Sequence, residues 1–259
     1  MQEENAGGVG ETNSGDRWEW LRTLIYAVLI AVFIRAVAYE PFNIPSSSMV
    51  PTLLVGDYLF VSKFSYGYSR HSLPFSLPLI PGRIFVTPPE RGDVAVFKLP
   101  SDDSVDYIKR LIGLPGDRIQ MRGGRLFING QKVKRDRIED FIVTDETGRL
   151  RRVPQFVETL PNGRRHRILE ITERGSLDDT EVFTVPAGHY FAMGDNRDNS
   201  SDSRVSGGGG SNGVGFVPIE NMVGRAEIMF FSTNGSARIW EPWRWPGAIR
   251  FGRFFRPVD

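Results

Sequence analysis

The chain has 259 residues, of which 40% are hydrophobic, so it is long and apolar enough to form a packed domain. Its 32 basic and 31 acidic side chains give a formal charge of +1, and this balance gives no indication of a nucleic-acid partner. The absence of cysteine excludes disulfides, thiolate-zinc sites and a cysteine nucleophile, although it does not fix the compartment.

The amino-terminal part predicts a cytoplasmic tail and a membrane anchor. Residues 1–17 are polar, glycine-rich and acidic, which is typical of a disordered tail. Residues 18–39 contain an uncharged run, and 19 helical residues would span roughly 28 Å, close to the thickness of a bilayer core. Arg22 and Arg35 lie near the two ends, where their side chains can reach the interface.

The distribution of basic residues predicts the orientation of this segment. Arg17 and Arg22 lie on its amino side, whereas no lysine or arginine occurs between Arg35 and Lys63. By the positive-inside rule the tail is cytoplasmic and the rest of the chain lies outside. The rule therefore predicts a single-pass membrane protein whose main domain lies on the extracytoplasmic side.

A cleaved secretory signal is the alternative interpretation of the same segment. Its apolar core is followed by Ala36, Val37 and Ala38, which form an Ala-x-Ala cleavage pattern. Cleavage there would leave Tyr39 as the first residue of a protein that is not anchored. Both interpretations stay open on the sequence.

The remaining chain predicts an all-β region with an insertion. Strands are expected, from β-branched and aromatic runs bounded by turn residues, at 57–61, 93–98, 105–112, 117–121, 125–128, 181–185, 189–193 and 223–231. We assign residues 40–131 and 179–259 to one main domain, a partly closed antiparallel sheet or barrel. The more polar residues 132–178, with weak strands at 141–144 and 167–171, form a smaller β-rich subdomain.

Two stretches outside the predicted strands have an unusual composition. Residues 71–81 interleave apolar residues with prolines, so they either cover the core as a loop or face lipid. Residues 240–256 mix aromatic rings with arginines, which suits a membrane surface, although some of the rings could belong to the core.

Three blocks contain the candidate chemistry. Residues 44–53 read Ile-Pro-Ser-Ser-Ser-Met-Val-Pro-Thr-Leu, and the two prolines restrict the backbone on either side of the serines. Residues 107–117 read Tyr-Ile-Lys-Arg-Leu-Ile-Gly-Leu-Pro-Gly-Asp, and residues 194–204 read Gly-Asp-Asn-Arg-Asp-Asn-Ser-Ser-Asp-Ser-Arg. A serine run alone is typical of a polar linker. Together and in this order, the blocks resemble the type I signal peptidases of bacteria, membrane-anchored Ser/Lys proteases that remove signal peptides from exported proteins.

A serine nucleophile needs a base, and the candidates are few. The three histidines, His71, His166 and His189, lie in settings that do not indicate a catalytic triad. Lys109 lies in an apolar run, where desolvation can lower the pKa of its amine until the neutral form acts as a base. A lone strand lysine is more often a surface charge or part of an ion pair, so this choice depends on the match of all three blocks.

The resemblance implies a role for each catalytic residue. Ser48 is the expected nucleophile, and Lys109 is the general base and later the general acid. The hydroxyl of Ser46 and the backbone N–H of Ser48 are expected to stabilise the oxyanion. Ser200 is expected to donate a hydrogen bond that orients the amine of Lys109.

The resemblance also implies substrate contacts and structural charges. The residues expected to line shallow pockets, for small side chains at the first and third positions before the cut, are Ile44, Pro45, Tyr107 and Ile108. The charges expected to hold the third block beside the site are Arg110, Asp195, Asp202 and Arg204. The substrate, an extended preprotein segment, is expected to add as a strand beside the serine segment or the lysine strand.

Other ligands find no support in the sequence. A calcium loop starting at Asp198 would have Ser203 at the turn glycine and Gly209 at the bidentate glutamate, so the motif fails. The glycine-rich residues 206–213 lack the ending of a phosphate loop, and they are inserted before Gly215 in comparison with the simplest family pattern. We therefore expect no metal ion, no cofactor and no nucleic acid, with preproteins and membrane lipid as partners of a monomer.

Two rival functions remain on the sequence alone. A Ser/Lys protease of the self-cleaving repressor type would lack a membrane helix and would carry a DNA-binding domain, and the sequence predicts neither feature. An anchored scaffold without catalytic activity is the rival from another class. Substitution of Ser48 and Lys109 distinguishes the scaffold from an enzyme, because a scaffold does not depend on them.

Overall fold

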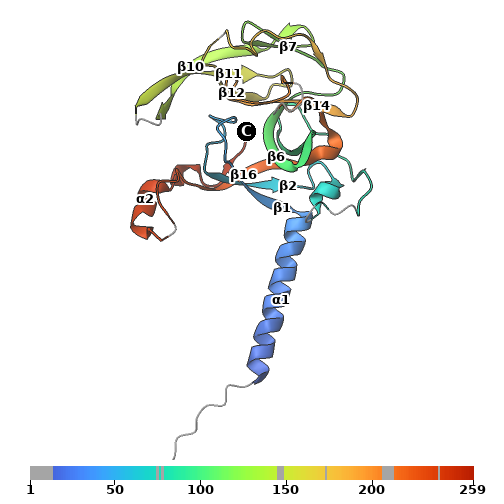
Figure 1. Cartoon of the computed structure of the whole chain (residues 1–259), viewed down its shortest axis with the longest axis vertical. Helices are drawn as coiled ribbons and strands as arrows, with labels where there is room; N and C mark the ends of the chain where they lie inside the picture. The colour runs from blue at the N-terminus through green and yellow to red at the C-terminus, as the bar shows by residue number, and fades with distance from the viewer. Residues whose placement is uncertain are drawn as a thin grey trace, which may run out of the picture.

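The computed structural model describes residues 14–73, 76, 79–144, 149–172, 174–205, 213–238 and 240–259. Figure 1 shows a long helix, α1 (Ser14–Val37), that projects from a body made of β-strands. Most of the expected tail at residues 1–17, and all but one residue of the glycine-rich stretch at 206–213, lie outside the described residues.

Helix α1 covers the predicted anchor and leads directly into the first strand. Its apolar side chains are exposed rather than packed on the body, with Leu24, Leu29 and Phe33 exposed by 45%, 58% and 66%. Within the described residues, none of the helices is both long enough and apolar enough to cross a membrane. The membrane-spanning anchor therefore stays a prediction.

The largest sheet has eight antiparallel strands and carries the expected core elements. Its order is β1 (Tyr39–Asn43), β2 (Asp57–Ser62), β16 (Met222–Ser232), β5 (Val94–Leu99), β6 (Asp102–Gly113), β14 (His189–Met193) and β15 (Val217–Pro218), with β17 (Arg256–Pro257) paired to β16. In the part of the chain that the structure describes, β1 and β15 each pair with a single neighbour, so this sheet forms no closed barrel. The expected all-β architecture is therefore present as an open, strongly bent antiparallel sheet that does not close into a barrel among the described residues (Figure 1).

Three smaller sheets complete the β structure. A four-stranded sheet has the order β13 (Phe183–Thr184), β7 (Arg118–Arg122), β8 (Arg125–Ile128) and β9 (Gln131–Lys132). A three-stranded sheet contains β10 (Lys134–Thr144), β11 (Leu150–Thr159) and β12 (Arg165–Leu169), and β3 (Tyr68–Ser69) pairs with β4 (Arg83–Ile84). Short helical turns occur at η1 (Arg70–Ser72), η3 (Ile219–Asn221), η4 (Pro242–Arg244), α2 (Trp245–Ala248) and η5 (Phe251–Arg253).

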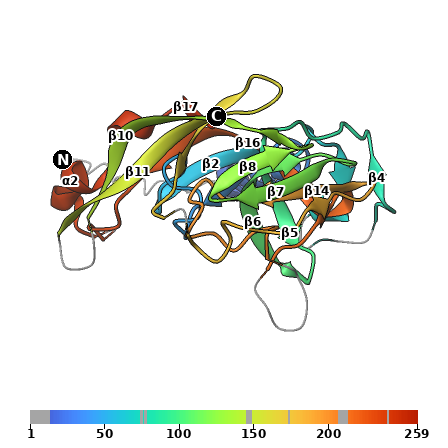
Figure 2. The same ribbon diagram turned by 90° about the horizontal axis from the view of Figure 1, so that it is seen from above.

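Apart from five strands of two residues each, the strands that the sequence analysis missed are β1 and β11. Strand β1 contains Pro41, and it follows the helix after one residue, so no turn signal marks its start. Strand β11 contains Pro154 and is polar along its first half, yet it pairs with β10 over most of its length. Seen from above, β10 and β11 form a long ribbon that extends to one side of the body (Figure 2). Pairing with β10 and β12 keeps this polar segment extended.

The hydrophobic core lies directly beneath the serine block. Ile44, Met49 and Leu53 of that block are at most 3% exposed, and they pack with residues of β2, β5 and β16. This burial fixes the backbone on both sides of the serines, because moving it would expose apolar side chains to water. The core therefore positions the serine block against the main sheet.

Candidate active site

The serine block forms a turn at the surface of the main sheet. The N–H of Val50 donates to the Ser47 carbonyl at 3.1 Å, and the N–H of Leu53 donates to the Met49 carbonyl at 2.9 Å. Ser48 comes immediately before the fully buried Met49, and its own residue is only 7% exposed. Ser48 is consequently largely shielded from solvent.

Ser48 and Lys109 are in direct contact. The Nζ atom of Lys109 donates to Ser48 Oγ at 2.6 Å and to the Ile108 carbonyl at 3.1 Å. The amine also lies 5.2 Å from the centre of the Tyr107 ring. Strand β6 brings the lysine to this position, although the two residues are 61 positions apart in the sequence.

Lys109 is buried, and burial changes its acidity. The residue is 4% exposed, and desolvation lowers the pKa of its amine to about 8, even though the carboxylates of Asp202 and Asp195 act in the opposite direction. Neither of these carboxylates forms an ion pair with the lysine in the described structure. A substantial fraction of the amine is therefore neutral near physiological pH, which is the form that can accept a proton.

Ser46 lies beside the same hydroxyl. Its Oγ is 3.1 Å from Ser48 Oγ, and it accepts a longer hydrogen bond, of 3.4 Å, from the N–H of Ser48. Ser46 is exposed, so a substrate can reach its hydroxyl. The two donors expected for an oxyanion, the Ser46 hydroxyl and the Ser48 amide, thus lie on one side of Ser48 Oγ.

Ser200 does not make the contact that the resemblance implied. Its buried Oγ has no hydrogen-bond partner among the described residues, and in particular none with Lys109. It packs against Gly194, where an added Cβ would be 2.2 Å from Ser200 Oγ and 2.6 Å from the Ser48 carbonyl oxygen. This close packing requires glycine at position 194, and the orienting role of Ser200 stays a prediction.

The expected structural charges are all buried and paired. Arg110 forms a bidentate pair with Asp195, with Nε–Oδ1 and Nη2–Oδ2 distances of 2.9 and 2.8 Å. Burial tends to raise the pKa of Asp195, but the guanidinium of Arg110 outweighs this effect and leaves the pKa below its usual value. Arg204 makes an equivalent bidentate pair with Asp202, with both N–O distances at 2.9 Å. The Arg110–Asp195 pair fastens the loop at residues 194–204 to strand β6, whereas the Arg204–Asp202 pair joins two residues within that loop.

Several residues that position the site were missed by the sequence analysis. Thr52 donates to Asp195 Oδ2 at 2.5 Å, which connects the serine block to the charged loop. The N–H of Asn196 donates to the Ser48 carbonyl at 3.0 Å, and Asn199 Nδ2 donates to Ser47 Oγ at 2.8 Å. Asparagines in an acidic loop gave no signal for these contacts, because the contacts depend on how two distant segments meet.

A cleft opens over Ser48 and Lys109. It is about 390 Å³ in volume, and its lining includes Pro45, Tyr107 and Ile108, three of the four expected substrate contacts. Ile44 is 3% exposed and belongs to the core, and it borders an adjoining cavity that shares Pro45 and Ile108 with the first. The two cavities form a continuous groove along the serine block and β6.

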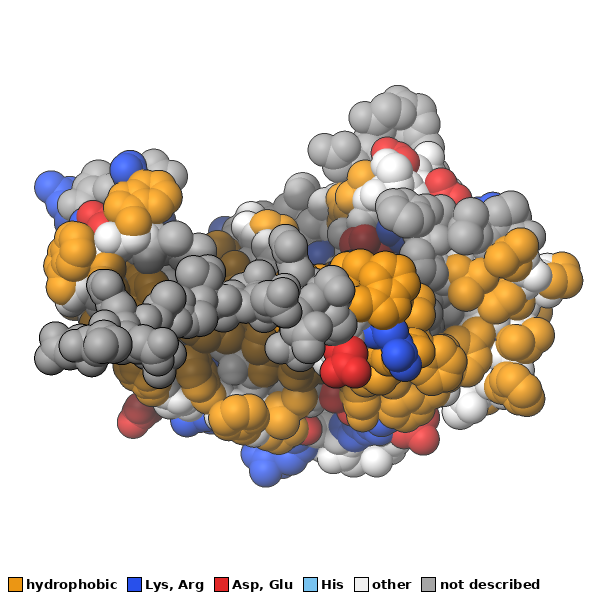
Figure 3. All heavy atoms as spheres, turned by 90° about the horizontal axis from the view of Figure 1, so that it is seen from below, with side chains coloured by type: hydrophobic (Ala, Val, Ile, Leu, Met, Phe, Trp, Pro, Cys, Tyr) orange, Lys and Arg blue, Asp and Glu red, His pale blue; other side chains and the backbone are white. Residues whose placement is uncertain are grey.

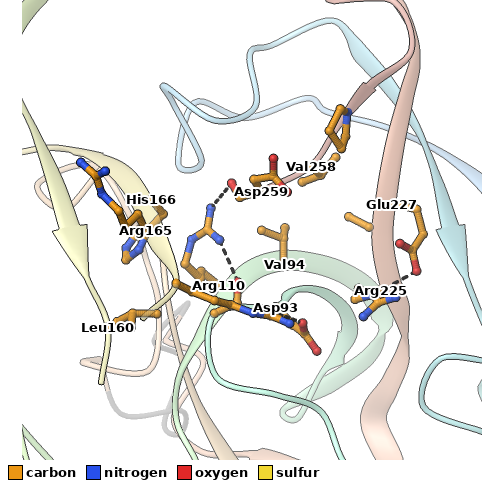
Figure 4. Close-up of a pocket in the computed structure, with 14 residues that line it drawn as sticks. Asp93, Val94, Arg110, Leu160, Arg165, His166, Arg225, Glu227, Val258 and Asp259 are labelled. Carbon is orange, nitrogen blue, oxygen red and sulfur yellow. Dashed lines mark hydrogen bonds and ion pairs between the residues drawn. The ribbon is translucent and has the colours of Figure 1, made fainter. Parts of the chain in front are cut away.

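A further cavity of about 450 Å³ is lined by residues of β5, β6, β12, β16 and the carboxyl-terminal segment. Figure 4 shows Arg110 extending into it towards Asp259, whose backbone oxygen accepts from Arg110 Nη2 at 2.8 Å. Its other charged groups include Arg225, which pairs with Glu227, and Arg164, which pairs with Asp93. Arg110 lines this cavity, but no serine or lysine does. The cavity is therefore separate from the contact between Ser48 and Lys109.

Comparison with known proteins identifies the family of this chain. The family model of signal peptidase, peptidase S26, matches residues 17–231. Signal peptidase I of Rickettsia canadensis is 45% identical over 230 residues, which cover 86% of this chain and 82% of the relative. Signal peptidase I of Rickettsia typhi is 46% identical over 216 residues, covering 80% and 78%. The crystal structure of a signal peptidase I from Enterococcus faecalis is 28% identical, with a TM-score of 0.30, and covers 54% of this chain and 97% of that chain.

The chain belongs to the signal peptidase I family, peptidase S26. It is a serine endopeptidase that removes signal peptides, and its substrates are preproteins. Membership of this family also implies a membrane-associated enzyme. The resemblance found in the three sequence blocks is thereby confirmed.

Proposed function

We propose that Ser48 is the nucleophile of this peptidase and that Lys109 is its general base. The observation that carries the proposal is the 2.6 Å contact between Lys109 Nζ and Ser48 Oγ, made by two buried residues. A buried lysine without a carboxylate partner can lose its proton near neutral pH, whereas an exposed or ion-paired lysine cannot.

The proposed reaction has two stages. The neutral amine of Lys109 accepts the proton of Ser48 as Oγ attacks the scissile carbonyl carbon, and the resulting oxyanion receives hydrogen bonds from the Ser46 hydroxyl and the Ser48 N–H. The ammonium then donates its proton to the leaving amine, and the C–N bond breaks to give an acyl-enzyme. In the second stage Lys109 takes a proton from water as the water oxygen attacks the ester carbonyl, and the ammonium then returns this proton to Ser48 Oγ as the C–O bond breaks, which restores both residues.

The groove supports an extended peptide as the substrate. Strand β6 pairs with β5 along one edge, whereas on its other edge the described pairing with β14 covers only residues 110–113. Residues 106–109 therefore present unpaired backbone groups towards the cleft, and a preprotein segment can add there as a strand. Pro45, Tyr107 and Ile108 leave shallow pockets, which favour small residues at the first and third positions before the cut.

The test of the dyad uses single, double and control variants. Ser48→Ala and Lys109→Ala are each expected to abolish cleavage of a preprotein, and the double variant is expected to be no worse, because groups that act as one unit are not additive. Ser47→Ala is the matched control, since its hydroxyl faces Asn199. Equal losses for the Ser47 and Ser48 variants, with unchanged circular dichroism, would contradict the assignment.

The proposed location is a single-pass anchor in the bacterial inner membrane, with the peptidase domain on the periplasmic or extracytoplasmic side. Support comes from the uncharged run at residues 23–34 and from the exposed apolar side chains of α1. Carbonate extraction with amino-terminal sequencing tests this proposal. Recovery in the soluble fraction with Tyr39 as the first residue would show that the segment is a cleaved signal.

A second contact with the membrane surface is part of the same proposal. Hydrophobic side chains gather on the face from which α1 projects (Figure 3). The carboxyl-terminal segment contributes further exposed rings, with Trp240, Trp243, Phe251 and Phe255 between 60% and 74% exposed. Aromatic rings and arginines favour the headgroup region of a bilayer, so the groove would face substrates that are held at the membrane.

The proposed domain organisation follows the sequence boundaries. Residues 40–131 and 179–259 would form the catalytic domain of a monomer, and residues 132–178 would form the inserted subdomain. The long ribbon of β10 and β11 lies within the insertion, which supports this division.

A further inference from the structure

A cluster of three carboxylates lies in the described structure apart from the Ser48–Lys109 contact. It consists of Glu170, which follows β12, Asp178 in the turn after it, and Asp198 in the loop at residues 194–204. One oxygen from each side chain lies within 4.8 Å of the others. Burial, together with the charges of Asp178 and Asp198, raises the pKa of Glu170 to about 8, so this carboxyl is mostly protonated near neutral pH unless a further positive charge lies beside it.

Glu170 provides an independent indication of what that charge is. Its side chain is 1% exposed, and neither of its carboxylate oxygens has a hydrogen-bond partner. The nearest cation is Arg135, whose Nη1 lies 3.6 Å from Glu170 Oε2. A buried carboxylate normally accepts several hydrogen bonds, so two oxygens without one indicate a ligand position directed at Asp178 and Asp198.

The backbone holds the other two carboxylates with one oxygen each. The N–H groups of Ile171 and Thr172 donate to Asp198 Oδ2 at 2.5 and 3.2 Å, and the N–H of Gly175 donates to Asp178 Oδ2. No described hydrogen bond uses the Oδ1 atom of Asp178 or Asp198. These two oxygens, together with those of Glu170, therefore remain available as ligands.

Glycine at position 175 allows the carboxylates of Asp178 and Asp198 to lie close together. A Cβ at this position would be 3.0 Å from Asp198 Oδ1 and 3.2 Å from Asp178 Oδ2, which is tighter than ordinary contact. A side chain at position 175 would therefore push the carboxylates apart. The glycine keeps the space between them open to a small ligand.

We infer that Glu170, Asp178 and Asp198 bind a calcium ion. Calcium takes six to eight oxygen ligands at roughly 2.3–2.6 Å, so two ligands on opposite sides of the ion are up to roughly 5 Å apart, whereas magnesium requires a tighter octahedron. Arg135 forms an ion pair with Glu170, and Arg197, the other nearby cation, is paired with Glu158. Water molecules and backbone carbonyls would complete the coordination.

This site differs from the calcium loop that the sequence excluded. That loop would have used Asp198, Ser200 and Asp202, whereas only Asp198 belongs to the cluster. The ion would join the end of β12 to the loop that contains Asn196 and Asn199, which hold the serine block. Calcium would accordingly stabilise the loop without taking part in the reaction, and the inference does not depend on the role of Ser48.

Isothermal titration and thermal unfolding of the full-length protein in detergent test the inference, after treatment with a chelator. We expect one calcium ion to bind per chain, and millimolar calcium to raise the melting temperature by about 3 °C or more. Asp198→Asn and Glu170→Gln are each expected to lower the calcium affinity at least about tenfold, because each removes a charged ligand. Asp179→Asn is the matched control, since this neighbouring aspartate is exposed and lies outside the cluster.

Two results would overturn the inference. One is the absence of both binding heat and a shift in melting temperature for the wild-type protein. The other is an unchanged calcium affinity in Asp198→Asn, which decides the question even when Glu170→Gln fails to fold, because Asp198 is exposed. An affinity loss in Asp179→Asn equal to that in Asp198→Asn would likewise assign the ion to a different place.

Discussion

Arg197 and Glu158 form a bidentate ion pair that is completely buried. Arg197 Nη1 donates to Glu158 Oε1 at 2.9 Å, and both side chains are 1% exposed. Burial alone would raise the pKa of Glu158, but the charge of Arg197 outweighs it and holds the pKa far below its usual value. His166 lies 3.5 Å from the same carboxylate. The pair fastens the loop at residues 194–204 to strand β11.

The first prediction concerns this ion pair. Glu158→Gln or Arg197→Met leaves one buried charge without its partner, so each is expected to lower the free energy of unfolding by about 3–5 kcal/mol. The double variant is expected to lose less than the sum, because it leaves neither charge unpaired. Urea unfolding of the four proteins measures these values. Additive losses would mean that the two residues act independently.

The second prediction separates the three consecutive serines. Ser46→Ala is expected to lower kcat by about 10²–10³, the usual effect of removing one oxyanion donor, with a small change in KM. Ser47→Ala is expected to change kcat by less than about tenfold, because its hydroxyl contacts only Asn199 among the described residues. Steady-state cleavage of one short peptide by both variants tests this difference. A larger loss of kcat in Ser47→Ala than in Ser46→Ala would mean that Ser46 is not the oxyanion donor of the proposed mechanism.

The third prediction concerns the pH dependence of cleavage. If the neutral amine of Lys109 is the base, kcat/KM is expected to rise tenfold per pH unit below its pKa of about 8 and to level off above it. The soluble peptide used for this profile should lack titratable groups near the cut. A plateau that already begins at pH 6 would mean that a group of lower pKa is the base.

The sequence predicted well those strands whose own residues form an apolar run between turn residues. Val94 to Lys98 and His189 to Met193 are apolar runs between turn residues, and they became β5 and β14. Strand β11 could not be predicted in this way, because Pro154 and its arginines match no strand pattern and its pairing with β10 decides its structure. Short-range propensity therefore accounts for the core strands and fails for the polar ribbon.

Local sequence patterns predict the contacts of the active site even less well than they predict strand β11. Ser48 and Lys109 were assigned through the resemblance of whole blocks, since nothing in their spacing places an amine 2.6 Å from a hydroxyl. The ion pair of Arg197 with Glu158 and the lack of a hydrogen bond at Ser200 depend on how the loop packs. Such contacts join segments that are distant in sequence, and local composition carries no information about them.

The fourth prediction concerns the histidines. None of His71, His166 and His189 contacts Ser48 or Lys109 in the described structure, so replacing all three by glutamine is expected to keep most of the activity per folded molecule. Some loss of stability is expected, because His166 is buried beside Glu158. Activity is therefore normalised to the folded fraction from circular dichroism. A thousandfold loss in the folded variant would contradict the choice of Lys109 as the base.

The fifth prediction concerns the stability of the Lys109→Met variant. The folded pKa of Lys109 is about 8 and its ordinary value is 10.5, so the unfolded chain binds the proton more tightly than the folded chain. Burial of this lysine therefore destabilises the fold, most strongly below pH 8, by roughly 3 kcal/mol according to the linkage between pKa and stability. The cost falls as pH rises from 8 towards 10.5, because the unfolded chain then loses its proton as well.

Methionine fills a similar volume without a charge, so the variant is expected to be inactive and more stable than the wild type near neutral pH. The advantage should shrink as the pH approaches 10, and this trend separates the titration of Lys109 from a simple gain in packing. Urea unfolding of both proteins at pH 7, 8.5 and 10 measures it, with Lys98→Met as a control for a lysine that pairs with Asp106 at the surface. An unchanged difference in unfolding free energy over this pH range would show that Lys109 is not the buried, proton-releasing amine of the site.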